Sequence, residues 1–442
     1  MNRKTLRLAV LIAAALASSG CGIFKKGKAK TPVVGERIAV LATESDVAVD
    51  PGTAALPMAL PEAVVNPTWS QSGGNASKTM GHVALGSTIG EAWQVSIGKG
   101  TSVAARLAAA PIVADGRVYT IDTLATVRAF DAQSGATVWQ TQFGVERGNE
   151  GALFGGGLAY ANGRIYATNG LGFVAAMDAT NGGLVWQVRP GGPLRGSPTV
   201  AGEALYVMSQ DNQIYSLKAA DGTTNWSQAA ALEIAGVFGV ASPAFAQGTV
   251  VAGFSSGELS AYRYENGRIV WQDALARTSI RTSVSSLSDI DADPVIDNGQ
   301  VIAIGQGGRM VGMELITGQR MWELNLAGIA TPWVAGDWVF VVTSDAKLMA
   351  IARATGKVRW IAQLPAFRHE KSKSGPISYV GPILAGGRLI VAGSNGALIN
   401  IDPLTGSFQT QTGIKAGVSL PPVVANNTLY ILDDDGRLHA FR

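Results

Sequence analysis

The feature that most constrains the fold is a glycine that stands four residues before a tryptophan, because this pairing recurs along most of the chain. It occurs six times, and a seventh copy keeps Gly406 but has Thr410 in place of the tryptophan. Counted from Trp93, successive tryptophans of this series lie 38 to 51 residues apart. Self-similarity at such a period is typical of repeat proteins, in which each unit packs on its neighbours. The six pairs are Gly135/Trp139, Gly182/Trp186, Gly222/Trp226, Gly267/Trp271, Gly318/Trp322 and Gly356/Trp360.

Each unit has the same internal order. In most copies a small residue and a proline open it, and two turns with their strands follow before the turn that precedes the tryptophan. Apolar and polar residues alternate in segments such as 117–121, which is the period of a half-buried strand. Four strands in ~45 residues make one propeller blade. Opening strands are expected near residues 110, 156, 197, 242, 293, 331, 381 and 421.

The two ends of the repeat region are predicted to build one blade together. The eighth unit, residues 420–442, stops before a tryptophan strand, whereas the strand around Trp93 has no unit of its own before it. Closing a ring with this N-terminal strand removes the unpaired edges that invite aggregation. We therefore predict an all-β fold over residues 67–442: an eight-bladed β-propeller of four-stranded blades, closed by an N-terminal strand.

The first residues are predicted to be an export signal. Three basic side chains precede ten consecutive apolar residues, 8–17. Ten residues are too few to cross ~30 Å of hydrocarbon as a helix. The small residues before Cys21 resemble a lipoprotein cleavage site, which predicts a signal peptide over 1–20 and a lipidated Cys21. Ser18 stands where such sites usually have leucine, so an ordinary secretory leader is the alternative.

Residues 21–66 are predicted to carry the lipidated cysteine on a flexible tether, because prolines punctuate them and no repeat unit is present. Gly22 follows the cysteine, where an aspartate would resemble an inner-membrane retention signal. This favours the outer membrane. We therefore expect a protein that is lipid-anchored to the cell outer membrane and faces the periplasm.

Composition argues against several classes of site. Cys21 is the single cysteine, so neither an intramolecular disulfide nor a cysteine-based metal centre is available. The three histidines, His82, His369 and His439, are too far apart in sequence to suggest a metal site or a catalytic base. Residues 66–442 carry 27 basic and 27 acidic side chains, which are the totals of 35 and 32 less the eight and five of residues 1–65. Residues 66–442 thus carry no net charge, which argues against nucleic-acid binding. No catalytic, cofactor-binding or metal-binding residue is nominated.

The unit resembles a known repeat. Its D-x-x-x-G-x-x-x-W ending, as in residues 131–139 and 178–186, is similar to the repeat of pyrroloquinoline-quinone (PQQ) dehydrogenases. Two classes of protein share that repeat: the quinoprotein dehydrogenases and the outer-membrane β-barrel assembly factor family, BamB. Many alcohol-oxidising quinoproteins carry a vicinal Cys-Cys beside the cofactor, and these enzymes are longer than this chain. The acidic run 433–435 lacks the rest of an EF-type calcium loop.

The leader, the tether and the eight units together resemble the BamB family. This resemblance implies a non-enzymatic scaffold lipoprotein of the BAM complex. Such a protein binds the POTRA domains of BamA alongside other BAM-complex lipoproteins and supports the folding and insertion of outer-membrane proteins. Its exposed blade edges would pair with unfolded strands by β-augmentation. The alternative functions are a PQQ-dependent quinoprotein dehydrogenase and a small-ligand-binding propeller, with an envelope polysaccharide binder as a weaker third.

Two segments match partner-contact segments of that family. The more specific is Leu-Ser-Asp-x-Asp at 287–291, which carries over Asp289 and Asp291 as partner-binding residues. Carboxylates on a rigid loop can pair with Arg or Lys across an interface. The alternative is an ordinary solvated loop whose aspartates cap turns.

The second segment precedes blade four and includes Val237 and Phe238. The family pattern has an arginine where this chain has Phe238. The aromatic side chain is expected either to anchor the partner or to belong to the core.

Overall fold

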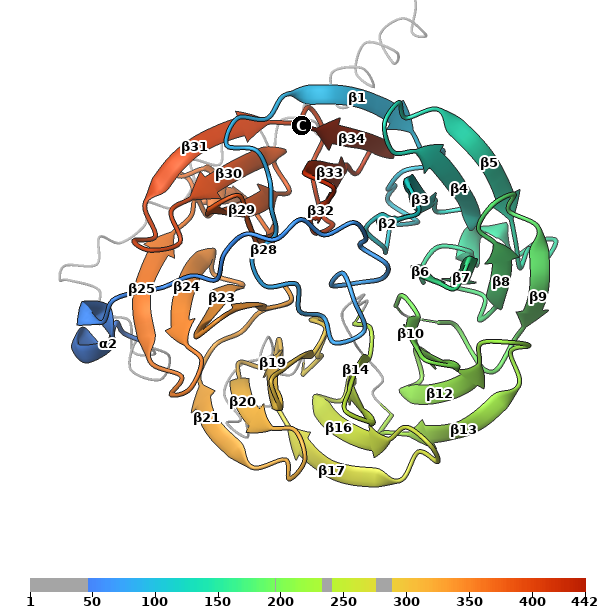
Figure 1. Cartoon of the computed structure of the whole chain (residues 1–442), viewed down its shortest axis with the longest axis horizontal. Coiled ribbons are helices and arrows are strands. Elements are labelled where there is room, and N and C mark those ends of the chain that lie inside the picture. The colour runs from blue at the N-terminus through green and yellow to red at the C-terminus, as the bar shows by residue number, and fades with distance from the viewer. Residues whose placement is uncertain (1–46, 195, 233–240, 276–287) are drawn as a thin grey trace, which may run out of the picture. The chain divides into compact units, whose positions relative to one another are not determined.

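The computed structural model describes residues 47–194, 196–232, 241–275 and 288–442. Within these ranges, the sheets include eight of four antiparallel strands each, arranged around a ring (Figure 1). The predicted eight-bladed propeller is therefore confirmed. Most first strands begin two residues after the predicted opening, because the proline that opens a unit lies just outside the strand ladder.

The strands of blades one to four follow the chain from the inner strand to the outer one. Blade one is β2 (Ile112–Ala114), β3 (Arg117–Ile121), β4 (Thr126–Asp131) and β5 (Thr137–Gln142). Blade two is β6 (Leu158–Ala161), β7 (Arg164–Thr168), β8 (Val174–Asp178) and β9 (Leu184–Val188). Blade three is β10 (Thr199–Ala201), β11 (Ala204–Met208), β12 (Gln213–Lys218) and β13 (Thr224–Ala229). Blade four is β14 (Ala244–Ala246), β15 (Thr249–Gly253), β16 (Glu258–Arg263) and β17 (Ile269–Ala274).

Blades five to eight complete the ring. Blade five is β18 (Val295–Asp297), β19 (Gln300–Ile304), β20 (Met310–Glu314) and β21 (Arg320–Leu324). Blade six is β22 (Trp333–Ala335), β23 (Trp338–Val342), β24 (Lys347–Ala352) and β25 (Val358–Gln363). Blade seven is β28 (Tyr379–Ala385), β29 (Arg388–Gly393), β30 (Ala397–Ile401) and β31 (Phe408–Gly413). Blade eight is β32 (Val423–Ala425), β33 (Thr428–Leu432), β34 (Arg437–Phe441) and β1 (Glu91–Ser96).

In the part of the chain that the structure describes, three short elements lie outside the blades. A hairpin, β26 (Phe367–His369) and β27 (Ser374–Pro376), is inserted before blade seven. The helical elements are α2 (Pro51–Ala55) and the 3-10 turn η1 (Glu150–Ala152). Over the described ranges, no helix has the length and apolar character needed to cross a bilayer.

The N-terminal strand closes the ring as predicted. β1 pairs antiparallel with β34, and Trp93 lies opposite Ala440. Beside the strand, Gly90 and Arg442 exchange backbone hydrogen bonds of 2.7 and 2.9 Å. The two halves of blade eight are therefore more than 300 residues apart in sequence and meet through a regular strand ladder.

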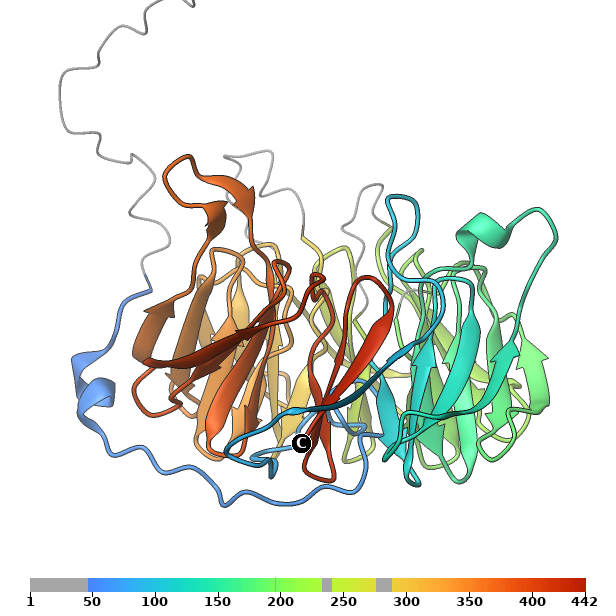
Figure 2. The same cartoon turned by 90° about the horizontal axis from the view of Figure 1, so that it is seen from above.

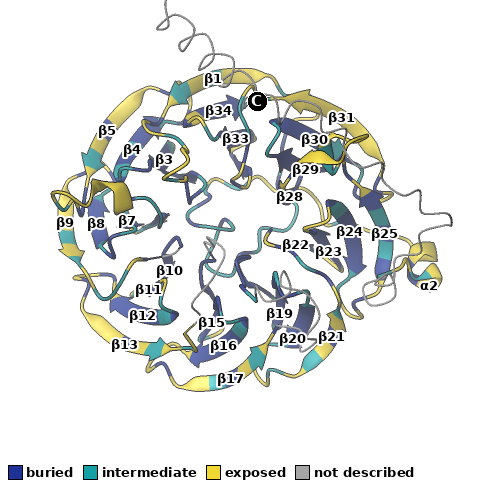
Figure 3. Ribbon diagram, turned by 180° about the vertical axis from the view of Figure 1, so that it is seen from behind, coloured by how far each residue is buried: buried dark blue, intermediate teal, exposed yellow. Residues whose placement is uncertain are grey.

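Burial follows the position of a strand within its blade. The second strands, such as β15 and β19, are buried along their whole length, whereas the outer strands are largely exposed (Figure 3). In β5 only Trp139 is buried. The core therefore lies between the inner three strands of neighbouring blades. Over the described residues the outer strands pair on one side only, apart from β25, where Val358 forms a parallel bridge with Val49.

The glycine and tryptophan of the repeat join seven of the eight blades to the next one, the exception being blade seven, which has Thr410 in place of the tryptophan. Trp139 donates a hydrogen bond from its indole N–H to the Ala179 carbonyl oxygen of blade two, at 3.0 Å. Gly182 packs against the Trp139 indole ring and has a φ of +75°. A Cβ added to Gly182 would come within 2.5 Å of Trp139. Only glycine meets both requirements without strain. The same donor-and-glycine arrangement recurs for Trp93, Trp186, Trp226, Trp271, Trp322 and Trp360.

A segment before blade one runs across one face of the ring and contacts every blade (Figures 1 and 2). We call residues 66–86 the crossing segment. It reaches blade three through two hydrogen bonds between Gln71 and Val200, and blade six through the Trp333 indole, which donates to the Gly81 carbonyl at 2.7 Å. The other blades make backbone hydrogen bonds to it: Asn426 to Asn66, Val113 to Trp69, Tyr160 to Ser70, Phe245 to Ala76, Ile296 to Ser77, and Gly386 to Val83.

Residues 47–66, which the sequence assigned to the tether, already contact the propeller. Asp50 caps α2 and donates its backbone N–H to the Val358 carbonyl oxygen at 2.9 Å. Arg359 donates to the Thr53 carbonyl oxygen at 3.1 Å, and Thr53 is 4 % exposed. The chain thus begins to pack against blade six well before the expected boundary, because short polar contacts of this kind leave no periodic signal in the sequence.

Candidate functional site

The ring encloses a central cavity of about 280 Å³. Its walls include the openings of several units, so the small-residue and proline pairs of the repeat have a shared location in the structure. They approach the axis because each opening precedes the innermost strand of its blade. The lining openings include Ala110-Pro111 of blade one, Ser197 of blade three, Asp293 of blade five, Thr331 of blade six, Gly381-Pro382 of blade seven and Pro421-Pro422 of blade eight.

The crossing segment forms the closed end of this cavity. Trp69 of the segment stacks on Trp333 of blade six, with ring centroids 6.0 Å apart and an interplanar angle of 16°. Both side chains line the cavity and are buried. Exposed residues mark its open end: Arg106, Ile329 and Ser378 belong to the same lining. The lining therefore combines buried aromatic side chains with residues that are exposed at the protein surface.

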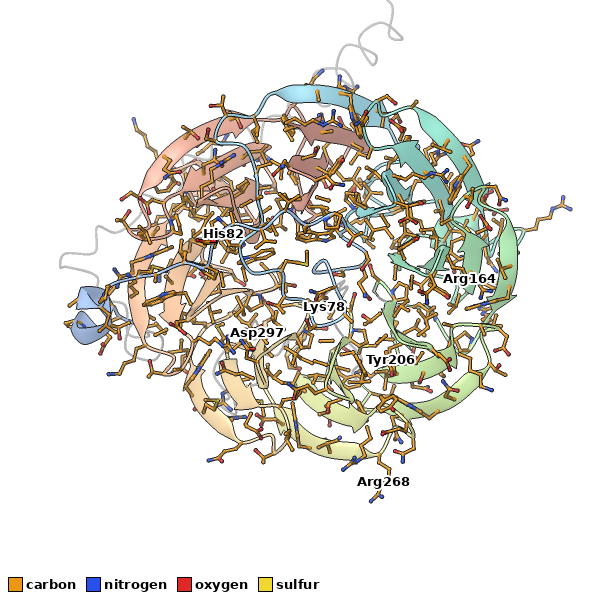
Figure 4. The ribbon with its side chains drawn as sticks, in the orientation of Figure 1. Lys78, His82, Arg164, Tyr206, Arg268 and Asp297 are labelled. Atoms are coloured by element: carbon orange, nitrogen blue, oxygen red, sulfur yellow. The ribbon has the colours of Figure 1, made fainter. Side chains whose placement is uncertain are left out.

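Lys78 of the crossing segment is a buried cation in this lining. It is 2 % exposed and lies near the middle of the ring (Figure 4). Its Nζ donates a hydrogen bond to Thr199 Oγ1 at 3.0 Å. Thr199 in turn donates to the Pro243 carbonyl oxygen at 2.6 Å, which leaves its oxygen to accept from the lysine. Burial lowers the pKa of Lys78 to about 8, against the opposing charge of Asp293.

Asp293 is the acidic group that faces Lys78. Its Oδ2 accepts a hydrogen bond from the Ser72 hydroxyl at 2.5 Å, and its Oδ1 accepts one from the Ser242 backbone N–H at 2.6 Å. Burial raises the pKa of Asp293, and the nearby charge of Lys78 counteracts part of that rise. A buried cation and a buried acid thus lie in the same cavity wall, where opposite charges interact more strongly than in water.

The predicted partner-binding acids lie in the connection between blades four and five. Asp289 is 0 % exposed and Asp291 is 7 % exposed, so neither carboxylate is solvated as the alternative of an ordinary solvated loop assumed. The connection is held on both sides, because Ile290 donates its N–H to the Phe254 carbonyl at 3.1 Å and Gln306 donates to the Asp289 carbonyl at 2.8 Å. Asp291 lines the central cavity. Whether these residues bind a partner stays a prediction.

The structure does not test the other predicted site residues. Cys21, Val237 and Phe238 lie outside the described residues. Among the residues that are described, no three His, Cys, Asp or Glu side chains gather as a set of metal ligands.

Comparison with known proteins places the repeat in a family. The family model described as outer membrane protein assembly factor BamB matches residues 123–362, which is more than half of the chain. The chain belongs to the BamB family. The matched region runs from blade one to blade six, so it includes most of the glycine–tryptophan joints.

Individual relatives agree with this family. The outer membrane protein assembly factor BamB of Salmonella typhimurium is 28 % identical over 376 residues, which cover 75 % of this chain and 83 % of that protein. The crystal structure of BamB from Moraxella catarrhalis has a TM-score of 0.68 at 20 % identity, and the likeness covers 80 % of this chain and all of that one.

The fold is also shared outside the BamB family. Quinohemoprotein alcohol dehydrogenase from Comamonas testosteroni has a TM-score of 0.68 at 14 % identity, over 86 % of this chain and 81 % of that chain. Identity this low shows the fold alone.

Sequence reasoning missed Lys78 and the cavity. Lys78 lies in a polar, glycine-rich stretch with no strand period, so nothing in the pattern indicates burial. The usable signal was the set of small-residue and proline openings, because the openings of six blades line the cavity around the axis.

Proposed function

We propose that this protein is a non-catalytic scaffold lipoprotein of the BAM complex, which binds the POTRA domains of BamA and supports the folding and insertion of outer-membrane proteins. The observation that carries the proposal is the BamB family match over residues 123–362. Relatives that match three quarters or more of this chain are named outer membrane protein assembly factors. The proposed place of action is the periplasmic face of the outer membrane, together with the other BAM-complex lipoproteins.

The exposed outer strands support a second part of the proposal. All six residues of β31 are exposed, and the strand pairs on one side only, with β30. A free edge of this kind can add an extended strand through main-chain hydrogen bonds. We propose that unfolded outer-membrane protein strands are the segments that pair there.

The experiment that tests the scaffold proposal is purification of the full chain through a C-terminal tag from gently solubilised membranes. BamA and other assembly lipoproteins should co-purify with it. Recovery of the protein without BamA would contradict the proposal. Recovery with a bound redox cofactor and dye-reducing activity would favour a quinoprotein instead.

The lipid anchor is tested by Cys21→Ala. Removing the acylated side chain should move the protein from the membrane fraction to the soluble periplasmic fraction, because several acyl chains on one residue supply the membrane affinity. The measurement is fractionation followed by immunoblotting. Ser18→Ala is the matched control, since it leaves the cysteine in place and should stay membrane-bound. Unchanged anchoring of Cys21→Ala would mean that the leader is not a lipoprotein signal.

The partner-contact proposal for Asp289 and Asp291 needs a gentle substitution. Arginine at either position would bury a cation and unfold the connection before binding could be measured. Asp289→Asn with Asp291→Asn keeps the size of both side chains and removes both charges. We expect about tenfold weaker BamA binding, which corresponds to about 1.4 kcal/mol.

The control for this pair is Asp221→Asn with Asp435→Asn, which removes two exposed acids on other blades. It should bind BamA as the native protein does. Melting curves recorded in parallel separate lost binding from lost structure. If the Asp289/Asp291 variant folds and binds BamA with native affinity, these two residues have a purely structural role.

A further inference from the structure

We propose that the central cavity is a binding site for a small organic anion, a carboxylate on an apolar or aromatic body, and that Lys78 binds its carboxylate group. This site is independent of the proposed scaffold role.

The backbone of Lys78 is unusual for a lysine. Its φ is +65°, in the left-handed region that favours glycine or asparagine. The chain is also tightly packed here, because a Cβ added to Gly73 would lie 2.9 Å from Lys78 Cα. A buried cation adds a second cost at the same residue, since an apolar side chain of similar size would avoid desolvation. Left-handed backbone at non-glycine residues and buried ionisable groups with shifted pKa values each cluster at functional sites.

The ammonium group retains capacity to bind. A lysine ammonium has three N–H donors, and the hydrogen bond to Thr199 occupies one of them. Across the described part of the chain, no carboxylate oxygen lies within 4.0 Å of its Nζ, and both oxygens of Asp293 already accept hydrogen bonds from Ser72 and Ser242. Lys78 therefore faces the cavity with donors that a ligand carboxylate would satisfy.

The walls define the rest of the ligand. Trp69, Trp333 and Tyr379 give the cavity aromatic surfaces, and prolines of three blade openings add further apolar ones. A volume of about 280 Å³ is close to the lower end of the ~300–1,000 Å³ typical of small-molecule sites. Arg106 at the exposed end adds a positive charge along the entry path. A single aromatic ring with a short acidic chain matches this combination.

The same groups predict how binding depends on pH. Among the described residues, the charged side chains that face Lys78 or share its cavity are Asp293, Asp291 and Arg106. Because burial lowers the pKa of Lys78 to about 8, the ammonium form that binds a carboxylate is lost as the pH rises above that value. Affinity for the anion should therefore be steady between about pH 6 and 7.5 and fall by about tenfold per pH unit well above pH 8.

The test uses the full chain and a series of three probes of one shape: 3-phenylpropionate, its neutral amide and the corresponding primary amine. Isothermal titration should show saturable binding of the carboxylate with one site per chain. The amide and the amine should bind at least about tenfold more weakly, which is about 1.4 kcal/mol. Equal affinity for carboxylate and amide, or no saturation at millimolar concentration, would overturn the proposal.

Lys78→Met supplies the residue-level test. It should lose at least about tenfold in affinity for the carboxylate, whereas Lys373→Met, the same change in the exposed β26–β27 turn, should bind as the native protein does. Retained binding by a folded Lys78→Met variant would overturn the assignment. If that variant does not fold, the probe series and the pH profile of the native chain still decide the matter, because a merely structural lysine predicts neither charge selectivity nor loss of affinity above pH 8.

Discussion

Replacing Trp271 by alanine should lower the free energy of unfolding by about 3–5 kcal/mol, the usual cost of deleting a large buried aromatic side chain. Trp271 is 8 % exposed and donates its indole N–H to the Leu315 carbonyl oxygen of blade five at 2.7 Å. Its ring lies against Gly318, where an added Cβ would come within 2.4 Å of it. The substitution therefore empties the joint between two blades and also leaves a carbonyl without its donor.

Denaturant unfolding followed by circular dichroism measures this effect, and Phe408→Ala is the control. Phe408 is also an aromatic residue on an outer strand, β31, but it is 51 % exposed, so its loss should cost well under about 1 kcal/mol. Trp271→Phe should lower the free energy of unfolding by an amount between those of Trp271→Ala and Phe408→Ala. It keeps most of the apolar contact but loses a hydrogen bond worth about 1 kcal/mol. Native stability of Trp271→Ala would mean that the blade joint does not depend on the indole.

The features that the sequence predicts correctly are those that repeat. The spacing of each glycine–tryptophan pair is fixed by the turn between the two residues and by their packing against neighbouring blades. The contact between blades can therefore be predicted from this spacing. The closing strand was predictable because Trp93 belongs to the same series and the last unit lacks its partner. Asp131 shows why the motif begins with an acid: its Oδ1 accepts from the Ser134 backbone N–H at 2.8 Å and holds the turn before the strand.

The features that the sequence does not predict are those that occur once. The crossing segment makes a few hydrogen bonds to each of the successive blades, and contacts of this kind have no period. Burial of Asp289 and Asp291 depends on which side of a connection faces the adjoining blades, which residue type alone does not encode. For the same reason the family resemblance indicated their segment without indicating that their side chains are inside.

Replacing His439 by leucine should lower the free energy of unfolding by about 3 kcal/mol at pH 6, because it removes the charged partner of the buried Asp433 carboxylate. His439 lies in β34 beside the closing strand. Its Nδ1 contacts Glu91 Oε1 of β1 at 2.7 Å, and its Nε2 contacts Asp433 Oδ2 at 3.1 Å. With a carboxylate at each ring nitrogen, the protonated form donates both hydrogen bonds, whereas a neutral ring supplies only one donor.

The size of this effect should depend on pH in a defined direction. Burial by itself lowers the pKa of His439, but the hydrogen bonds to Asp433 and Glu91 outweigh burial, so the pKa is raised in the folded protein. A raised pKa gives stability that is complete below the unfolded value of about 6.5 and is lost as the pH rises through the higher folded value. The stability difference between the native protein and His439→Leu should therefore be largest near pH 6 and shrink at pH 9.

His369→Leu is the matched control, because His369 is exposed in the β26–β27 hairpin. It should change stability by less than about 0.5 kcal/mol at either pH. Since Glu91 belongs to the strand that completes the ring and His439 to the last strand of the chain, the cluster links the two ends of the propeller. A His439→Leu effect that is equal at pH 6 and pH 9 would show that the histidine stabilises the closure through packing and not through its charge.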